Sequence, residues 1–187
     1  MGKLNSVCVY CGSSNAVDRQ YMVLAEETGR ALASADIRLV YGGGGVGLMG
    51  ACARACHNAG GRVLGIMPKF LLQKERIFEE VEHTIVEDMH SRKQLMFNES
   101  DAFIVLPGGI GTLEEAVEML SWARLGLHAK PMAFVDRDGF WEPFFDLIEH
   151  IIGGGFTPEE FRGSLVHTNH PEEALQALAD RCVVLDV

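Results

Sequence analysis

The sequence predicts an α/β fold built on a doubly wound, mostly parallel sheet of the Rossmann-like kind. Short apolar runs of strand length alternate with longer segments of helical period along all 187 residues. Glycine clusters stand where strands end and helices begin. Strands that alternate with helices throughout a chain form parallel sheets covered on both faces. Because no linker or repeat interrupts the pattern, a single domain over residues 1–187 is expected.

The elements follow the chain in a regular order. Expected strands cover residues 7–11, 38–41, 62–67, 84–87, 103–106, 132–135 and 165–167. Expected helices cover residues 18–34, 48–59, 88–100, 112–124, 140–152 and 171–181. Glycines directly after the second and fifth helices are typical helix stops. Residues 68–82 have mixed charge and no clean period, which predicts a loop with a short helix.

The segment from Asp101 to Glu115 combines a strand, a glycine loop and a helix. Pro107 and the three glycines up to Gly111 cannot continue the preceding strand, and a helical pattern begins at Thr112. Backbone N–H groups of such a loop and of the first helical turn can point together at one anion. The segment therefore predicts a phosphate-binding site.

Two charges of opposite sign flank this loop on helices. Glu115 projects beside the apolar face of helix 112–124, and Arg92 lies within the apolar side of helix 88–100. An unpaired buried charge is costly, so such positions favour a chemical role. Two structural alternatives stay open. Thr112 and Glu115 match a capping box, and Arg92 can extend its charge to solvent along apolar surface.

Two further strand ends offer ligand contacts. Ser13 follows the first strand, and Gly43 and Gly44 follow the second, at the edge where open α/β sheets bind ligands. The glycines at 45, 47 and 50 match the dinucleotide fingerprint formally. The acidic residue expected after the next strand is missing, because residues 67–69 are Met, Pro and Lys. This disfavours an NAD(P) oxidoreductase but retains a second phosphate loop.

Composition limits the partners. A net charge of −10 disfavours nucleic acid and anionic membrane surfaces, which select for clustered Lys and Arg. Five cysteines without an export pattern predict reduced thiols in the cytoplasm. Cys8 and Cys11 should point to opposite faces of a strand, and no second pair has zinc-finger spacing, so no metal is expected.

Helix 112–124 also points to self-association. Met119 and Trp122 widen its apolar arc beyond what one side of a sheet needs. A two-fold dimer is the simplest arrangement that would cover the additional apolar surface.

Several motifs together resemble the Lonely Guy family of cytokinin riboside 5′-monophosphate phosphoribohydrolases, whose members have often been labelled lysine decarboxylases. The paired signature is Met89-His-Ser-Arg92-Lys93 followed by Pro107-Gly-Gly-Ile-Gly-Thr-Leu-Glu-Glu115. The segments Tyr10-Cys-Gly-Ser-Ser, Tyr41-Gly-Gly-Gly, Gly47-Leu-Met-Gly50 and Trp122-Ala-Arg-Leu-Gly also fit. The resemblance covers nearly the whole chain.

The resemblance implies hydrolysis of the N-glycosidic bond of an adenosine 5′-monophosphate, often N6-prenylated, without a cofactor or metal. It implies a homodimer with the site near the interface, and it makes Arg92 and Glu115 the catalytic pair. It assigns nucleotide binding to Lys93, Gly108, Gly109, Ile110, Gly111, Thr112 and Glu114. Ser121 stands where plant members have Thr, and Glu75 aligns with a substrate-contacting glutamate when one residue is gapped.

The expected mechanism and its competitors can be stated from these residues. Glu115 stabilises an oxocarbenium-like sugar and activates water, while Arg92 holds Glu115 ionised. Phe70, Leu71, Leu72 and Met89 are candidates for a pocket around the base, although core packing is the alternative use. The main competitor is a non-catalytic nucleotide or molybdenum-cofactor carrier, which needs glycine loops but no such charge pair. Pyridoxal-dependent decarboxylation is disfavoured because no lysine stands out in the predicted site.

Overall fold

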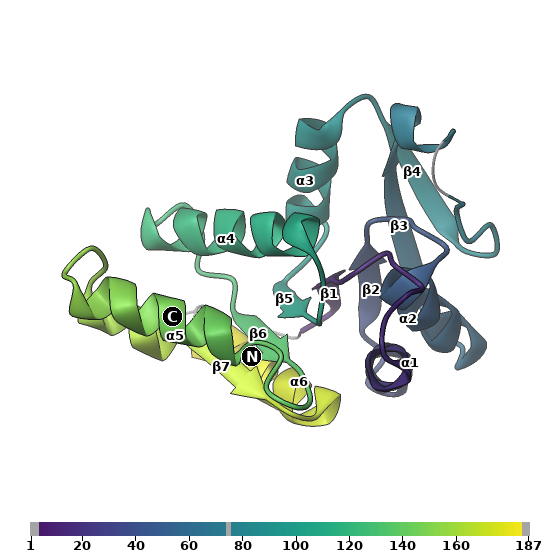
Figure 1. Ribbon diagram of the computed structural model, residues 1–187. Coiled ribbons are helices and arrows are strands. Elements are labelled where there is room, and N and C mark those ends of the chain that lie inside the picture. The colour runs from purple at the N-terminus through teal and green to yellow at the C-terminus, as the bar shows by residue number, and fades with distance from the viewer. Residues whose placement is uncertain (1–3, 74–75, 185–187) are drawn as a thin grey trace.

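A computed structural model describes residues 4–73 and 76–184 and contains one seven-stranded sheet (Figure 1). The strand order is β4-β3-β2-β1-β5-β6-β7, and every neighbouring pair is parallel. The strands are β1 (Ser6–Tyr10), β2 (Arg38–Tyr41), β3 (Val63–Pro68), β4 (Glu82–Val86), β5 (Ala102–Val105), β6 (Met132–Val135) and β7 (Leu165–Thr168). This confirms the predicted doubly wound α/β architecture.

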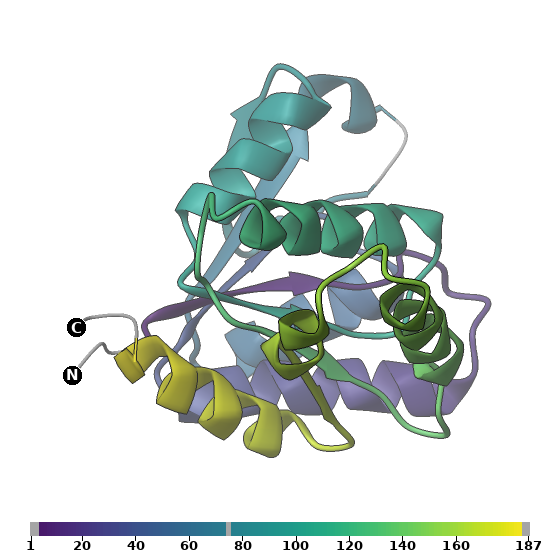
Figure 2. The ribbon, with the colours of Figure 1, turned by 90° about the vertical axis from the view of Figure 1, so that its left-hand side faces the viewer.

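Helices cover both faces of the sheet. They are α1 (Arg19–Ser34), α2 (Gly47–Asn58), α3 (Met89–Asn98), α4 (Ile110–Arg124), α5 (Glu142–Gly153) and α6 (Pro171–Val184), with short 3₁₀ turns at η1 (Lys69–Leu71) and η2 (Glu159–Ser164). Figure 2 shows α1 and α6 along the lower face and α4 along the upper face. The described part of residues 68–82 contains η1, as the sequence predicts.

The two faces of the sheet bury separate apolar clusters. Val7, Val9 and Cys11 of the first strand segment point to the cluster with α1, α2 and α6, while Cys8 and Tyr10 point to the cluster with α3, α4 and α5. Cys8 and Cys11 therefore lie on opposite sides of the sheet, as predicted. Because the central strands are buried on both faces, they are apolar throughout rather than alternating.

Helix α4 corrects two sequence-based expectations. It begins at Ile110 rather than Thr112, two residues earlier than its apolar period indicates. Met119 is fully buried in the chain's own core, and Trp122 packs edge-on against Phe97 with ring centroids 5.5 Å apart. Met119 therefore adds no apolar surface for a partner, whereas Trp122 is only partly buried, so the reason given for expecting a dimer is wrong for Met119. The apolar side chains that α4 exposes are Ile110 and Val117.

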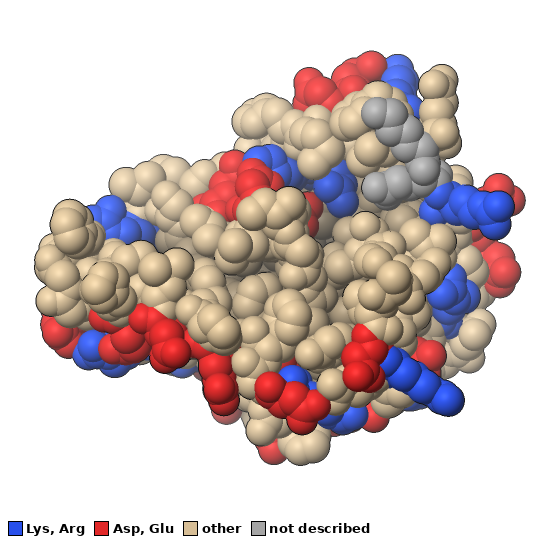
Figure 3. All heavy atoms as spheres, viewed as in Figure 1, with Lys and Arg blue, Asp and Glu red and all other residues tan. Residues whose placement is uncertain are grey.

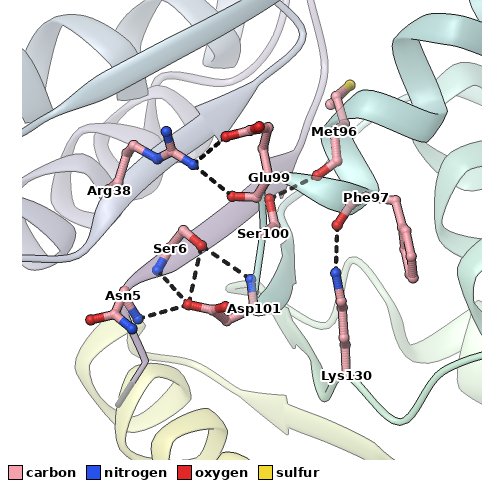
Figure 4. A network of polar contacts seen from close by, with 9 residues as sticks. All are labelled: Asn5, Ser6, Arg38, Met96, Phe97, Glu99, Ser100, Asp101 and Lys130. Carbon is pink, nitrogen blue, oxygen red and sulfur yellow. Dashed lines mark hydrogen bonds and ion pairs between the residues drawn. The ribbon is translucent and has the colours of Figure 1, made fainter. Parts of the chain in front are cut away.

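Polar contacts anchor the C-terminal end of α3 to the sheet (Figure 4). Arg38 of β2 donates to the backbone carbonyl and the carboxylate of Glu99, at 3.0 and 2.6 Å. Asp101 accepts hydrogen bonds from the backbone N–H groups of Asn5 and Ser6 and from the Ser6 hydroxyl. Only Arg92 and Met96 of α3 are buried. These polar contacts add to the apolar packing of Leu95, Met96 and Phe97 in placing the helix.

Figure 3 shows charged side chains of both signs mainly along the edges and in the upper part of this face, whereas its middle is largely uncharged. Within the described residues, no helix is long and apolar enough to cross a membrane.

Replacing Asp101 with Ala should lower the free energy of unfolding by about 2 kcal/mol, because three donors lose a charged acceptor. Urea denaturation monitored by circular dichroism would measure the change. Asp146→Ala, at an exposed position on α5, is the matched control and should change stability by less than about 0.5 kcal/mol. Equal midpoints for the two variants would contradict the anchoring role.

Candidate active site

The candidate site lies where the strand order reverses, between the carboxyl ends of β1 and β5. The two strands continue to pair beyond their ends: Leu106 N–H donates to the Tyr10 carbonyl at 2.9 Å, and Gly12 N–H donates to the Pro107 carbonyl at 3.1 Å. This is the usual ligand position in an open α/β sheet. A cleft of about 500 Å³ opens there. A smaller hollow of about 320 Å³ adjoins it across Gly12, Ser13 and Gly109.

The glycine loop delivers the start of α4 to this cleft. Gly109 is the residue before the helix, and the N–H groups of Ile110, Gly111 and Thr112 have no carbonyl one turn earlier to accept them. A side chain at Gly108 would meet the Thr112 hydroxyl at 2.2 Å, so glycine there permits the tight turn. Thr112 is thus inside the first helical turn, and the capping-box interpretation of Thr112 and Glu115 is wrong.

Arg92 and Glu115 form an ion pair inside the cleft. Arg92 Nη1 lies 3.2 Å from Glu115 Oε1. The exposed fractions of Arg92 and Glu115 are only 6% and 5%. The two residues stand on separate helices, α3 and α4. The guanidinium does not extend to solvent, so the alternative of a snorkelling arginine is wrong. The prediction that the two charges meet beside the glycine loop is confirmed.

Burial dominates the ionisation of Glu115. It raises the pKa of this carboxyl from 4.5 to about 7, even though the positive charge of Arg92 opposes the rise. The expectation that Arg92 would hold Glu115 ionised therefore needs correction. Near neutral pH the carboxyl is poised between its two forms, which suits a group that exchanges protons with a reactant.

Most of the predicted residues line this cleft or the hollow beside it. Gly108 lines the adjoining hollow, and Ser13 and Gly109 line both spaces. The other predicted residues that line the cleft are Met89, Arg92, Ile110, Gly111, Thr112, Glu114 and Glu115.

Lys93 and Ser121 are not among the residues that line the cleft. Lys93 binds the carboxylates of Glu114 and Glu118 at 2.7 and 3.0 Å, so it ties α3 to α4. Ser121 lies on the exposed side of α4, seven residues beyond Glu114 and roughly 10 Å along the helix. Glu75 lies outside the described residues.

The second glycine run is used for packing. Gly44 forms an isolated bridge with Ile77, and Gly43 lies against the side chain of Met67. The donors at the start of α2 are already occupied: Gly47 N–H by the Asn15 side chain, and the N–H groups of Leu48 and Met49 by the Gly12 carbonyl. A second phosphate loop at this helix is therefore wrong, and Gly43 and Gly44 are not among the residues that line the cleft.

Three lining residues add to the predicted site. Cys11 and Gly12 follow β1, and Met49 comes from the first turn of α2. The position of Gly12 directly after the expected strand 7–11 was a usable signal, whereas Cys11 was expected inside that strand and nothing in the sequence singled out Met49. Phe70 and Leu71, whose expected alternative use was core packing, instead lie on the cleft wall, and Phe70 is exposed.

Comparisons with known proteins agree with this geometry. A model of the family described as "Possible lysine decarboxylase" matches residues 49–178. A cytokinin riboside 5′-monophosphate phosphoribohydrolase from Oryza sativa subsp. japonica is 41% identical over 179 residues, which are 95% of this chain and 74% of the relative. The chain belongs to the Lonely Guy family. An Arabidopsis thaliana phosphoribohydrolase of the same name is also 41% identical, over 95% of this chain and 83% of its own length.

Solved structures share the fold of this Lonely Guy chain. The molybdenum cofactor carrier protein from Chlamydomonas reinhardtii superimposes with a TM-score of 0.73 at 18% identity, over 97% of this chain and 99% of the carrier. The molybdenum cofactor binding protein from Rippkaea orientalis gives 0.71, also at 18% identity, over 95% and 97% of the two chains. At this identity the likeness establishes the architecture alone.

The pKa of Glu115 predicts a specific dependence of stability on pH. Because its native pKa, about 7, exceeds the unfolded value of 4.5, the carboxyl binds protons more tightly in the native state. The wild type should therefore lose about 3 kcal/mol of stability, relative to Glu115→Gln, as the pH rises from 4.5 to above 7. Urea denaturation of both proteins across this range measures the difference. Parallel stability curves would contradict the raised pKa.

Proposed function

We propose that this chain hydrolyses the N-glycosidic bond of adenosine 5′-monophosphate or an N6-modified relative, releasing the base and ribose 5-phosphate. The observation that carries the proposal is the buried Arg92–Glu115 pair, 3.2 Å apart, beside the free N–H groups at the start of α4. Membership of a family whose relatives are named cytokinin riboside 5′-monophosphate phosphoribohydrolases supports the same reaction. The reduced state of the described cysteines is compatible with a cytoplasmic location.

The start of α4 is the proposed site of the 5′-phosphate. Ile110, Gly111 and Thr112 supply N–H donors at the positive end of a 15-residue helix. Phosphate held there is remote from the bond that breaks, so its binding energy can position the sugar for reaction. The apolar cleft wall of Met49, Phe70 and Leu71 is the proposed surface for the base and any N6 substituent.

Glu115 is the proposed catalytic group. As the bond between C1′ and the base nitrogen breaks, positive charge develops on the sugar and negative charge on the base. The ionised carboxylate can stabilise the sugar and take a proton from the attacking water, whose oxygen bonds to C1′. The departing base takes up a proton from solvent, and Glu115 releases the proton that it took from the water, so one water molecule is added across the bond. Arg92 can orient the carboxylate and bind a ribose or phosphate oxygen.

Competing functions explain the site less well. A nucleotide or cofactor carrier needs the glycine loop, but it gains nothing from a buried carboxylate whose pKa is near 7. Among the described residues that line the cleft there is no lysine to support lysine decarboxylation. An NAD(P) enzyme would need the N-terminal donors of α2, which the chain's own groups occupy.

We further infer a homodimer formed through α4. Ile110, Glu114, Val117 and Ser121 share one exposed side of this helix, and 84% of Ile110 and 46% of Val117 remain exposed. A second copy packed on this side would cover both apolar side chains and bring Ser121 to the interface, on the same side of α4 as Glu114 at the end of the cleft. The expected role of Ser121 in substrate binding would then depend on the dimer.

Incubation with AMP and with N6-isopentenyl-AMP, followed by chromatography for free base, tests the reaction. Glu115→Gln should reduce turnover roughly a hundredfold or more while AMP still binds, as measured by calorimetry. The wild-type kcat/KM should rise with pH and level off above about 7, because the ionised carboxylate is the active form. The control is Glu26→Gln on the exposed side of α1. Near-normal turnover by Glu115→Gln would reject the catalytic role, and no base release by the wild type would reject the reaction.

Val117→Glu should convert the dimer to a monomer, because it buries a charge in the proposed interface. Light scattering after size exclusion measures the mass. Leu147→Glu, at an exposed apolar position on α5, is the matched control and should remain dimeric. A wild type that is monomeric at micromolar concentration would contradict the proposed interface.

A further inference from the structure

The guanidinium of Arg92 is held at all three nitrogens. Nε donates to the Ile66 carbonyl at 3.3 Å, Nη2 donates to the Gly42 carbonyl at 3.4 Å, and Nη1 faces Glu115. Ile66 belongs to β3, and Gly42 directly follows β2. The backbone of two neighbouring strands therefore fixes the plane of the group that reaches across to α4.

The guanidinium of Arg92 occupies the space that a side chain at position 42 would fill. A Cβ atom built on Gly42 would lie 1.9 Å from Arg92 Nη2 and 3.1 Å from its Cζ. The next atom, Met49 Sδ, is at 3.5 Å, an ordinary contact. Any side chain at position 42 would therefore displace the end of Arg92 before it disturbed anything else.

We propose that Gly42 is a positioning residue for the reaction: its carbonyl and its missing side chain together hold the Arg92 guanidinium against Glu115. The inference rests on the proposed function for its catalytic consequence, but its structural part stands on the contacts alone. It assigns the first glycine after β2 a role in the charge pair, separate from phosphate binding.

The backbone of Gly42 does not itself require glycine. Its φ is outside the left-handed region, unlike that of Gly43 at +82°. The colliding atoms belong to the far end of a flexible side chain. Gly42→Ala should therefore fold, with Arg92 rather than the main chain accommodating the methyl group.

Displacing Arg92 should change the titration of Glu115. Several charged or titratable groups surround this carboxyl: Arg92 and Lys93 from α3, Glu114 and Glu118 from α4, and Cys8, Tyr10 and Cys11 on or just after β1. Arg92 is the strongest of the influences that lower the pKa of Glu115. Moving its charge away removes that influence, so the pKa of Glu115 should rise above about 7.

The test is a direct titration of Glu115 by carbon-13 NMR, with the carboxyl signal assigned through its loss in Glu115→Gln. Gly42→Ala should raise this pKa by at least half a unit and lower kcat/KM at pH 7 at least tenfold, with AMP binding reduced less. Gly61→Ala is the matched control, since its methyl would press on Cys56 Sγ at 2.6 Å and Ala33 Cβ at 2.8 Å, at the amino end of β3. It should lower stability without moving the Glu115 titration.

A double variant completes the test. In an Arg92→Ala background, Gly42→Ala should cause no further change in the titration, and it should restore folding if Gly42→Ala alone folds poorly. An unchanged Glu115 pKa in Gly42→Ala, an equal shift in Gly61→Ala, or misfolding that persists without Arg92 would each overturn the proposal. If the titration shifts but the wild type releases no base from AMP, the positioning role stands and the proposed reaction fails.

Discussion

The buried ion pair between Arg92 and Glu115 is the constraint around which the site is arranged. Removing two charges from water costs several kcal/mol for each ion, and a single contact at 3.2 Å does not by itself repay that cost. The positive charge of Arg92 offsets only part of the cost of burying the Glu115 carboxylate, since the pKa of Glu115 is about 7 rather than 4.5. A carboxyl kept in this unfavourable environment is reactive toward protons at neutral pH, which a purely structural pair would not need to be.

The pair also joins two halves of the sheet. Arg92 is held by the Gly42 carbonyl just after β2 and by the Ile66 carbonyl within β3, whereas Glu115 stands on the helix that follows β5. Between them, β1 and β5 continue to pair through Gly12 and Pro107. The network at the opposite end of α3, where Arg38 binds Glu99, fixes the helix that carries the arginine. Contacts far from the cleft therefore contribute to the geometry of the charges inside it.

Much of this arrangement could be predicted from sequence, because strand and helix periods show which charges fall on apolar faces. That reasoning found Arg92, Glu115 and the glycine loop that precedes the helix of Glu115. It failed where a backbone group decides the outcome: the start of α4 at Ile110, and the N–H groups of α2 taken by the Gly12 carbonyl. Met119 was misjudged because helical period alone does not show how deeply the chain itself buries a side chain above the sheet.

The two glycine runs illustrate why glycine-rich motifs need a structure before a function can be assigned. Both follow parallel strands and both precede helices, yet only the run before α4 leaves the donors of its helix free. The glycines of the other run let neighbouring groups come close to the backbone: Gly44 pairs with Ile77, and Gly42 leaves room for the guanidinium of Arg92. The same fold occurs in molybdenum cofactor carriers at 18% identity, so the architecture alone does not select the chemistry. In this chain the chemistry depends on which groups the glycines leave room for. Gly42 leaves room for the guanidinium of Arg92, the cation that faces Glu115.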